Sequence, residues 1–186
     1  MTPLFFVIYL KYAALGIPFV VVPFLLLVLL TYSEVTDFLD GHLARKHGLV
    51  SDLGKLLDPM ADSITRISLL LILTQGVIRV PLYWVLLFLY RDLIISTLRT
   101  LCALKGVTLA ARTSGKIKAI LQAIVTFAIV VLMIPYAFGW LDQYTVHIVS
   151  STLVAVVSLY TIGSGIEYFI ANWKYIREFW VVVPSD

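Results

Sequence analysis

Six long apolar stretches alternate with short polar segments along the chain. They cover about residues 4–20, 23–45, 55–74, 81–104, 114–134 and 146–169. Each stretch is close in length to the roughly 20 apolar residues that an α-helix needs to cross the hydrocarbon core of a bilayer. Short segments that contain Pro, Gly or charged residues separate most of them. The pattern predicts an all-α, polytopic membrane protein with six transmembrane helices in a single domain, residues 1–186.

The composition supports this interpretation and excludes other classes of protein. Of the 186 residues, 61% are apolar and 13% are charged, and the mean hydropathy is +0.99. A water-soluble domain has about 45–50% apolar and about 25% charged residues. Cys102 is the one cysteine of the chain, so a disulfide-stabilised secreted fold is excluded. The high hydrophobicity also excludes intrinsic disorder.

The Lys and Arg residues gather in three parts of the sequence. One separates the second and third apolar stretches, another separates the fourth and fifth, and the last follows the sixth. Six helices bring all three parts to one side, which the excess of basic residues marks as cytoplasmic. We therefore expect both termini to be cytoplasmic and the protein to lie in the inner (cytoplasmic) membrane. The net charge of +3 is explained by these positions, so nucleic-acid binding is not needed to explain it.

The acidic residues are concentrated in one short part of the chain. A carboxylate within a membrane span is costly and is treated by default as functional. Six of the eleven acidic residues lie between positions 34 and 62. They are Glu34, Asp37, Asp40, Asp52, Asp58 and Asp62.

The spacing of these residues places carboxylates on matched helix faces. Positions separated by three, four, seven and eight residues lie on one face of an α-helix. In the second apolar stretch these positions are Asp37, Asp40, Gly41, Ala44 and Arg45. In the third, Asp58 and Asp62 are four residues apart, and Gly54 lies one turn before Asp58. The eight residues between Arg45 and Gly54 are enough for a tight turn between two helices. We therefore expect the two faces to meet on neighbouring helices.

Four converging carboxylates indicate a metal site. They repel one another unless cations compensate their charge, and oxygen ligands suit Mg²⁺, Mn²⁺ or Ca²⁺. Two ions fit the charge, and two-metal sites stabilise the attacking and leaving oxygens of phosphoryl-type displacements. Gly41 and Ala44 would let a bulky group approach the helix backbone, and Arg45 would bind phosphate oxygens. The residues therefore predict metal-assisted chemistry on a phosphate ester or anhydride.

The same positions resemble a known family, the CDP-alcohol phosphotransferases. The family pattern is D-x2-D-G-x2-A-R-x8-G-x3-D-x3-D. This chain matches it at every spacing with Asp37, Asp40, Gly41, Ala44, Arg45, Gly54, Asp58 and Asp62.

The resemblance implies a six-helix membrane enzyme that transfers a substituted phosphate from a CDP-linked donor to an alcohol and releases CMP. It implies that the four aspartates hold two divalent cations, Mg²⁺ or alternatively Mn²⁺. Asp62 would also be the general base on the acceptor hydroxyl. The resemblance further suggests a homodimer. The residues that would accommodate the CDP group are Asp40, Gly41, Ala44, Arg45 and Gly54.

A second resemblance narrows the prediction within this family. Residues 91–99, RDLIISTLR, and 115–122, GKIKAILQ, are similar to motifs of the bacterial phosphatidylglycerolphosphate synthases. Ala119 departs from the Thr that these enzymes usually carry. This resemblance implies CDP-diacylglycerol as the donor and glycerol-3-phosphate as the acceptor. That acceptor is a dianion and needs a cationic pocket, for which the candidates are Arg91, Arg99, Arg112, Lys116 and Lys118.

Other interpretations remain open from the sequence. A sister enzyme of the same family would use another acceptor, such as inositol phosphate, serine or phosphatidylglycerol. A divalent-cation transporter would use the same carboxylates along a path through the bilayer. The acids cluster near one predicted interface beside Gly, Ala and Arg, and a fixed cation hinders an ion path, so we favour the enzyme.

Overall fold

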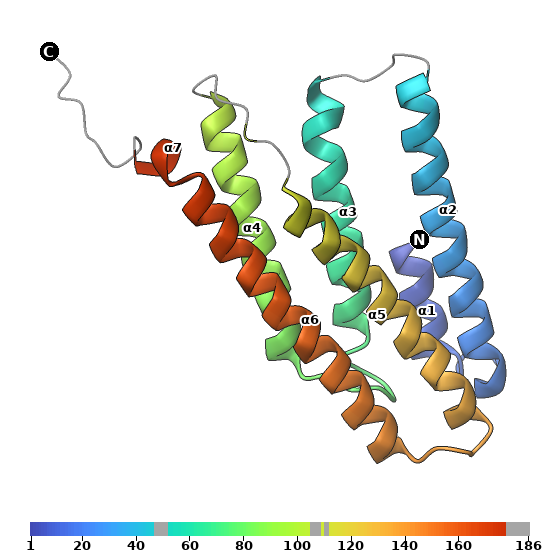
Figure 1. The fold of residues 1–186 in the computed structure, drawn as a ribbon. Helices are drawn as coiled ribbons and strands as arrows, with labels where there is room; N and C mark the ends of the chain where they lie inside the picture. Colours follow the sequence, from blue (N-terminus) through green and yellow to red (C-terminus); the bar gives the residue numbers. More distant parts are fainter. Residues whose placement is uncertain (47–51, 105–108, 110–111, 178–186) are drawn as a thin grey trace, which may run out of the picture.

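The structure is a computed structural model that describes residues 1–46, 52–104, 109 and 112–177. Every regular element in these residues is helical, and the helices run side by side as a bundle (Figure 1). The elements are α1 (Thr2–Lys11), a short 3-10 helix η1 (Phe19–Val21), α2 (Val22–Lys46), α3 (Asp52–Ile72), α4 (Leu82–Leu104), α5 (Thr113–Ala137), α6 (Gln143–Ala171) and α7 (Trp173–Arg177).

The helices α2 to α6 confirm five of the six predicted helices. Their ends lie within three residues of the predicted ends, because long apolar runs bounded by polar residues define helices well. The prediction of one helix over residues 4–20 is wrong in length. Helix α1 ends at Lys11, after which Gly16 adopts a left-handed backbone conformation with φ of 69°. Pro18 is extended, and these two residues turn the chain into α2.

Two helix ends differ from the predicted positions for local reasons. Helix α5 continues past Pro135 to Ala137, since a proline so near the end disrupts few intrahelical hydrogen bonds. Helix α6 begins early because Asp142 caps it by accepting a hydrogen bond from the Thr145 N–H. Hydrogen bonds from the Thr145 side chain and backbone hold the pKa of Asp142 below its usual value. The cap is therefore present at neutral pH and is lost only as the pH falls through that lowered pKa.

Three helical segments among the described residues are long and apolar enough to cross a membrane. They are Phe19–Asp37, Thr113–Ala137 and Gln143–Ala171. Helix α1 has ten residues and is about 15 Å long, half the thickness of a bilayer core. Helices α3 and α4 have 21 and 23 residues, but each carries several charged side chains. The structure thus supports an all-helical membrane protein, and the count of six spans stays a prediction.

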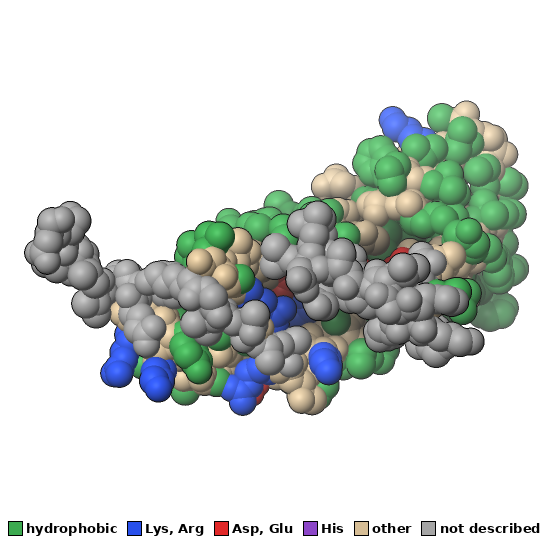
Figure 2. Space-filling model, turned by 90° about the horizontal axis from the view of Figure 1, so that it is seen from above, with side chains coloured by type: hydrophobic (Ala, Val, Ile, Leu, Met, Phe, Trp, Pro, Cys, Tyr) green, Lys and Arg blue, Asp and Glu red, His purple; other side chains and the backbone are tan. Residues whose placement is uncertain are grey.

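The basic residues gather at one end of the bundle. The ends of α2 and α4, the beginnings of α3 and α5, and the short helix α7 all lie at this end (Figure 1). Seen from this end, Lys and Arg side chains lie along the edge and within the centre of the bundle (Figure 2). Arg112 and Lys116 at the start of α5, with Lys174 and Arg177 on α7, belong to this end. We refer to it below as the basic end.

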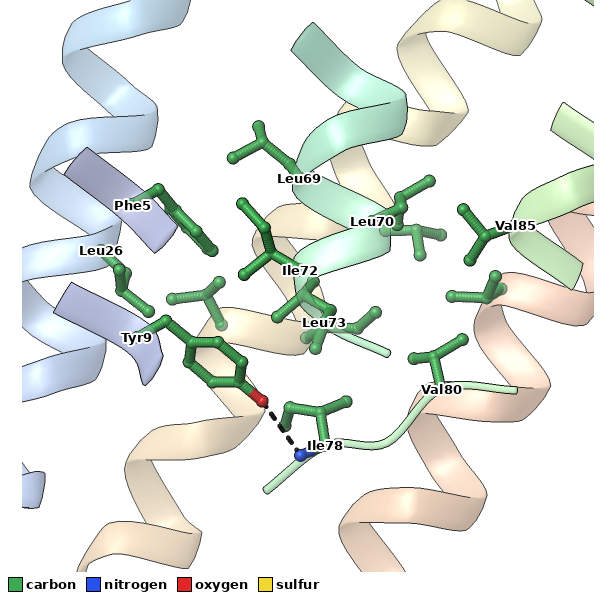
Figure 3. Packing of buried hydrophobic residues seen from close by; sticks show 14 of the residues in the cluster. Phe5, Tyr9, Leu26, Leu69, Leu70, Ile72, Leu73, Ile78, Val80 and Val85 are labelled. Carbon is green, nitrogen blue, oxygen red and sulfur yellow. Dashed lines mark hydrogen bonds between the residues drawn. The ribbon is translucent and has the colours of Figure 1, made fainter. Parts of the chain in front are cut away.

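Apolar packing holds the opposite half of the bundle together. Phe5 of α1, Leu26 of α2, Leu70 of α3 and Val85 of α4 are all buried in one cluster (Figure 3). Helix α1 contacts both α2 and α3. The short first helix therefore fills the space between these two helices in the half that lies away from the basic end.

Tyr9 fastens the connection between α3 and α4 to this apolar cluster. Its ring is 2% exposed, its hydroxyl donates to the Gln75 carbonyl at 2.9 Å, and it accepts from the Ile78 N–H at 3.1 Å. Gly76 has a φ of 66°, and a Cβ there would lie 3.0 Å from the Tyr9 ring. The turn therefore needs glycine both for its conformation and for its contact with Tyr9.

The first prediction concerns Tyr9→Phe. This change leaves the Ile78 N–H buried without its acceptor, so we expect the free energy of unfolding to fall by about 1–3 kcal/mol. Thermal unfolding of the purified protein in detergent measures the loss. Tyr12→Phe is the matched control, because the Tyr12 ring packs against Phe19 and the phenylalanine ring keeps this contact. Equal melting temperatures for Tyr9→Phe and wild type would contradict the prediction.

Candidate functional site

Two of the four predicted metal-binding aspartates have described side chains. Asp37 is exposed near the basic end of α2. Asp62 on α3 has a side chain that is 45% exposed, and one of its oxygens lies 3.7 Å from Nη2 of Arg66 one turn later. This long ion pair leaves carboxylate oxygen of Asp62 accessible. The side chains of the other pattern residues lie outside the described set, although their backbones belong to α2 or α3: Asp40, Gly41, Ala44, Arg45, Gly54 and Asp58.

Helices α2 and α3 are joined through other helices among the described residues. Helices α1 and α5 each contact both of them. A cavity of about 440 Å³ is lined by Glu34 of α2, Arg66 of α3 and five α5 residues. Glu34 lies one turn before Asp37, and Arg66 one turn after Asp62. The two helices that carry the aspartates therefore border a cavity with polar groups on both sides and an apolar wall formed by α5.

The available donors fit a divalent cation. No group of three metal-binding side chains occurs among the residues with described side chains, and that set lacks Asp40 and Asp58. Carboxylate oxygens are the ligands that Mg²⁺ prefers in proteins. Asp62 is partly exposed and only loosely paired with Arg66, so it has oxygen free to coordinate an ion. The residues present are thus compatible with the predicted metal site.

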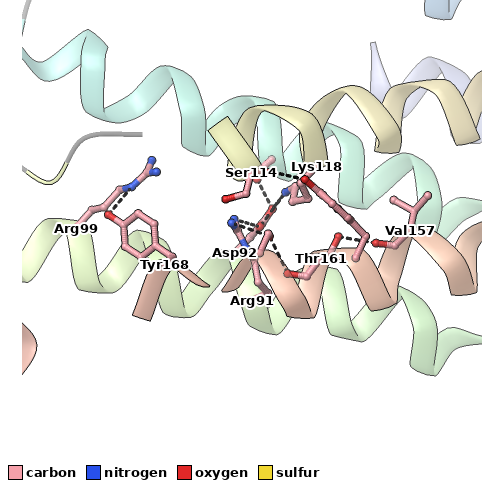
Figure 4. A network of polar contacts seen from close by, with 11 residues as sticks. Arg91, Asp92, Arg99, Ser114, Lys118, Val157, Thr161 and Tyr168 are labelled. Carbon is pink, nitrogen blue, oxygen red and sulfur yellow. Dashed lines mark hydrogen bonds and ion pairs between the residues drawn. The ribbon is translucent and has the colours of Figure 1, made fainter. Parts of the chain in front are cut away.

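A second polar cluster lies in the bundle around Asp92 of α4 (Figure 4). Asp92 is 9% exposed and Lys118 of α5 is 3% exposed. The Lys118 Nζ donates to both Asp92 oxygens, at 2.8 and 2.6 Å. Arg91 donates to Asp92 at 3.1 Å, and the Ser63 hydroxyl of α3 also donates to Asp92. One carboxylate therefore receives hydrogen bonds from side chains on three helices.

Arg91 extends this cluster to α6. One of its terminal nitrogens donates to the Ser164 hydroxyl at 3.2 Å. A Cβ at Gly165 would lie 3.1 Å from Cγ of Arg91, so the missing side chain of Gly165 makes room for the arginine. The Nε of Arg91 is buried without a hydrogen-bond partner among the described residues. Arg91 is thus held firmly and keeps one donor unused.

The other predicted acceptor-binding cations have different surroundings. Arg99 donates to the Tyr168 hydroxyl at 3.2 Å and lies over its ring. Arg112, just before α5, pairs with Glu167 at 3.2 Å, and both side chains are exposed. Lys116 is exposed. The structure brings Arg91 and Lys118 together, whereas Arg99 and Arg112 each have a separate partner on α6.

Several residues of this region were not found from the sequence. Ser63, Ser164 and Tyr168 each bind one of the charged side chains. The sequence carries one usable signal, because a cation within an apolar helix needs a buried partner. It does not reveal that Lys118 pairs with Asp92, since their helices are adjacent only in the folded bundle.

Comparison with known proteins agrees with the resemblance in the motifs. Residues 1–158 match the family model of the CDP-alcohol phosphatidyltransferases. A Bacillus subtilis (strain 168) protein named CDP-diacylglycerol–glycerol-3-phosphate 3-phosphatidyltransferase is 33% identical over 153 residues, 81% of this chain and 74% of the relative. A protein of the same name from Rickettsia bellii is 32% identical, over 80% of this chain and 78% of its own length. One from Yersinia enterocolitica is 28% identical, over 89% and 87%.

The family match covers most of the chain and every position of the aspartate pattern. It spans α1 to α5 and the first half of α6. It therefore includes both helices that border the cavity and the α4 and α5 residues of the Asp92 cluster. The chain belongs to the CDP-alcohol phosphatidyltransferase family.

Proposed function

We propose that this protein transfers the phosphatidyl group of CDP-diacylglycerol to glycerol-3-phosphate, giving phosphatidylglycerolphosphate and CMP. The observation that carries the proposal is the shared name of relatives that match about 80% of the chain at 31–33% identity. The aspartate pattern on α2 and α3 supports it independently. The cavity between these helices has a polar group on the α2 side, another on the α3 side and an apolar wall formed by α5. This combination suits a donor that is part nucleotide and part lipid.

In this proposal the aspartates and their neighbours hold the donor. Asp37, Asp40, Asp58 and Asp62 would hold two divalent cations, Mg²⁺ or alternatively Mn²⁺. Such ions stabilise negative charge on the pyrophosphate and on the departing CMP. The CDP group would lie against Asp40, Gly41, Ala44, Arg45 and Gly54.

Asp62 is the proposed general base. It accepts the proton of the glycerol-3-phosphate hydroxyl as that oxygen bonds to the β-phosphorus of CDP-diacylglycerol. The bond from the β-phosphorus to the bridging oxygen breaks, and CMP leaves with that oxygen. The partial exposure of the Asp62 carboxylate supports this role, because a base must reach the proton it removes.

The acceptor phosphate would bind near Arg91, Arg99, Arg112, Lys116 and Lys118. Arg91 and Lys118 share Asp92, and Arg112 pairs with Glu167, so these cations outnumber the carboxylates they bind and the region suits a dianion. Arg91 and Arg99 belong to α4, Lys116 and Lys118 to the start of α5, and Arg112 directly precedes α5.

The proposal includes an orientation in the membrane. The basic end would face the cytoplasm with both termini on that side, six helices would span the inner membrane, and the protein would act as a homodimer. The Lys and Arg side chains at one end support this orientation (Figure 2).

The second prediction tests the acceptor. Purified protein in detergent micelles with CDP-diacylglycerol is given radiolabelled glycerol-3-phosphate, inositol phosphate, serine or phosphatidylglycerol. We expect CMP release and a labelled lipid with glycerol-3-phosphate alone, because its small dianionic phosphate matches the cationic region. Turnover with another alcohol instead would show that the proposed acceptor is wrong. Metal flux in liposomes without CMP release would indicate a transporter.

The third prediction concerns Asp62→Asn. Removing a general base lowers kcat by about 10²- to 10⁴-fold, and we expect donor binding to be partly retained. Steady-state CMP release measures kcat, and binding of labelled CDP-diacylglycerol measures affinity. Asp142→Asn is the matched control, since the same change at the cap of α6 lies at the opposite end of the bundle. Wild-type turnover by Asp62→Asn would refute the assignment of the base.

The fourth prediction concerns metal removal. Dialysis against EDTA should abolish CMP release, and Mg²⁺ should restore it, because the clustered carboxylates need cations to bind a pyrophosphate. A sample dialysed with Mg²⁺ present is the control. Full activity in protein whose measured metal content is below one ion per chain would contradict the metal requirement.

A further inference from the structure

Asp92 joins four helices at one point. It lies on α4 and accepts hydrogen bonds from Ser63 on α3 and from Lys118 on α5. Its neighbour Arg91 binds both Asp92 and Ser164 of α6 (Figure 4). Two cations share this single carboxylate, so Asp92 is held from two directions. Its position is therefore well defined relative to α4, α5 and α6.

Among the described residues, the hydrogen bond from the Ser63 hydroxyl connects this cluster to α3. Ser63 directly follows Asp62 in the chain. A helical residue and its neighbour are separated by a fixed rotation of about 100°, so fixing the direction of Ser63 also fixes the direction of Asp62. Asp62 itself pairs with Arg66 at 3.7 Å. Arg66 lies on the same helix, so this pair cannot set the rotation of α3 in the bundle.

The cluster does more than helix packing requires. Removing charged groups from water is costly, and well-packed apolar residues often stabilise a protein as much as a buried ion pair does. Helix α3 already packs through Leu70 and Ile72 in the half away from the basic end. In the half that carries Asp62, the bond from Ser63 to Asp92 is a directional contact between α3 and α4. A directional bond sets rotation more sharply than apolar contact does.

We infer that Asp92 is a positioning residue, which acts through the Ser63 hydroxyl to set the direction of Asp62 toward the acceptor hydroxyl. Arg91 and Lys118 hold Asp92 in place for this purpose. The inference rests on the proposed function, because Asp62 is the general base there. Neither Ser63 nor Asp92 forms or breaks a bond in the reaction.

Ser63→Ala is the decisive variant, since it removes this hydroxyl and leaves every charge in place. A misplacement of about 1 Å in a reacting group lowers the rate by up to roughly 100-fold. We expect kcat for CMP release to fall about 10- to 100-fold, with the KM for both substrates within twofold of wild type. Ser63→Thr keeps the hydroxyl, and the 180 Å³ pocket that Ser63 lines has room for the added methyl group. This variant should restore kcat to within about threefold of wild type.

Ser68→Ala is the matched control. Ser68 lies on the same helix and lines the same pocket, but it does not bind Asp92. It should leave kcat and the melting temperature unchanged. The inference is overturned if Ser63→Ala keeps wild-type kcat, if Ser63→Thr is as slow as Ser63→Ala, or if Ser63→Ala lowers the melting temperature without changing kcat.

A double-mutant cycle with Asp92→Asn completes the test. If both residues act through one bond, adding Ser63→Ala to Asp92→Asn should lower kcat by less than threefold beyond Asp92→Asn alone. Fully multiplicative effects would overturn the inference. Should Asp92→Asn fail to fold, because it leaves Lys118 without its counter-charge, the Ser63 series decides alone.

The acceptor assay on the wild-type protein tests the proposed function separately from the role of Asp92. If another alcohol is the acceptor, the same variants are compared with that alcohol, and the ratio of variant to wild type still tests Asp92. If the wild type releases no CMP with any alcohol, the proposed function is wrong and the inference falls with it.

Discussion

The buried carboxylate of Asp92 is the constraint on which the arrangement of α3, α4, α5 and α6 depends. Removing a charge from water costs several kcal/mol, which is recovered only when partners lie at hydrogen-bonding distance. The partners come from three helices, and Arg91 adds the fourth through Ser164. Each helix must therefore present its polar side chain at the same depth in the bundle. Apolar contacts alone do not impose this condition, because similar side chains pack almost equally well after a small shift.

The two halves of the bundle divide the tasks of stability and chemistry. Away from the basic end, α1 fills the space between α2 and α3, and Tyr9 fixes the connection to α4. Toward the basic end, α1 no longer intervenes, and Asp37 and Asp62 lie on helices that border a cavity. The short first helix thus bridges the two aspartate-bearing helices in the half away from the basic end and leaves the space between them unfilled by α1 in the other half.

Much of this arrangement could be predicted from the sequence, because its signals are local. Long apolar runs predicted α2 to α6 within three residues at each end, and the i, i+3 and i+4 spacing placed the aspartates on helix faces. The length of α1 could not be predicted from hydrophobicity, since Gly16 and Pro18 interrupt the helix without interrupting the apolar run. The pairing of Lys118 with Asp92 was also missed. It depends on the rotation of α5 against α4, and spacing within one helix carries no information on that angle.

The surroundings of the cations distinguish those that can receive a phosphate from those that hold the fold. Lys118 is buried against Asp92, and breaking a buried pair costs about 3–5 kcal/mol. The pair of Arg112 with Glu167 is exposed on both sides, and such pairs contribute about 0–1 kcal/mol. In the proposed reaction, an arriving dianion would therefore displace Glu167 from Arg112 at far lower cost than Asp92 from Lys118. Lys116, one turn after Arg112, is also exposed. Within the proposed acceptor site, the start of α5 would therefore make the first contact with the phosphate, and Lys118 would add positive charge while it stays paired with Asp92.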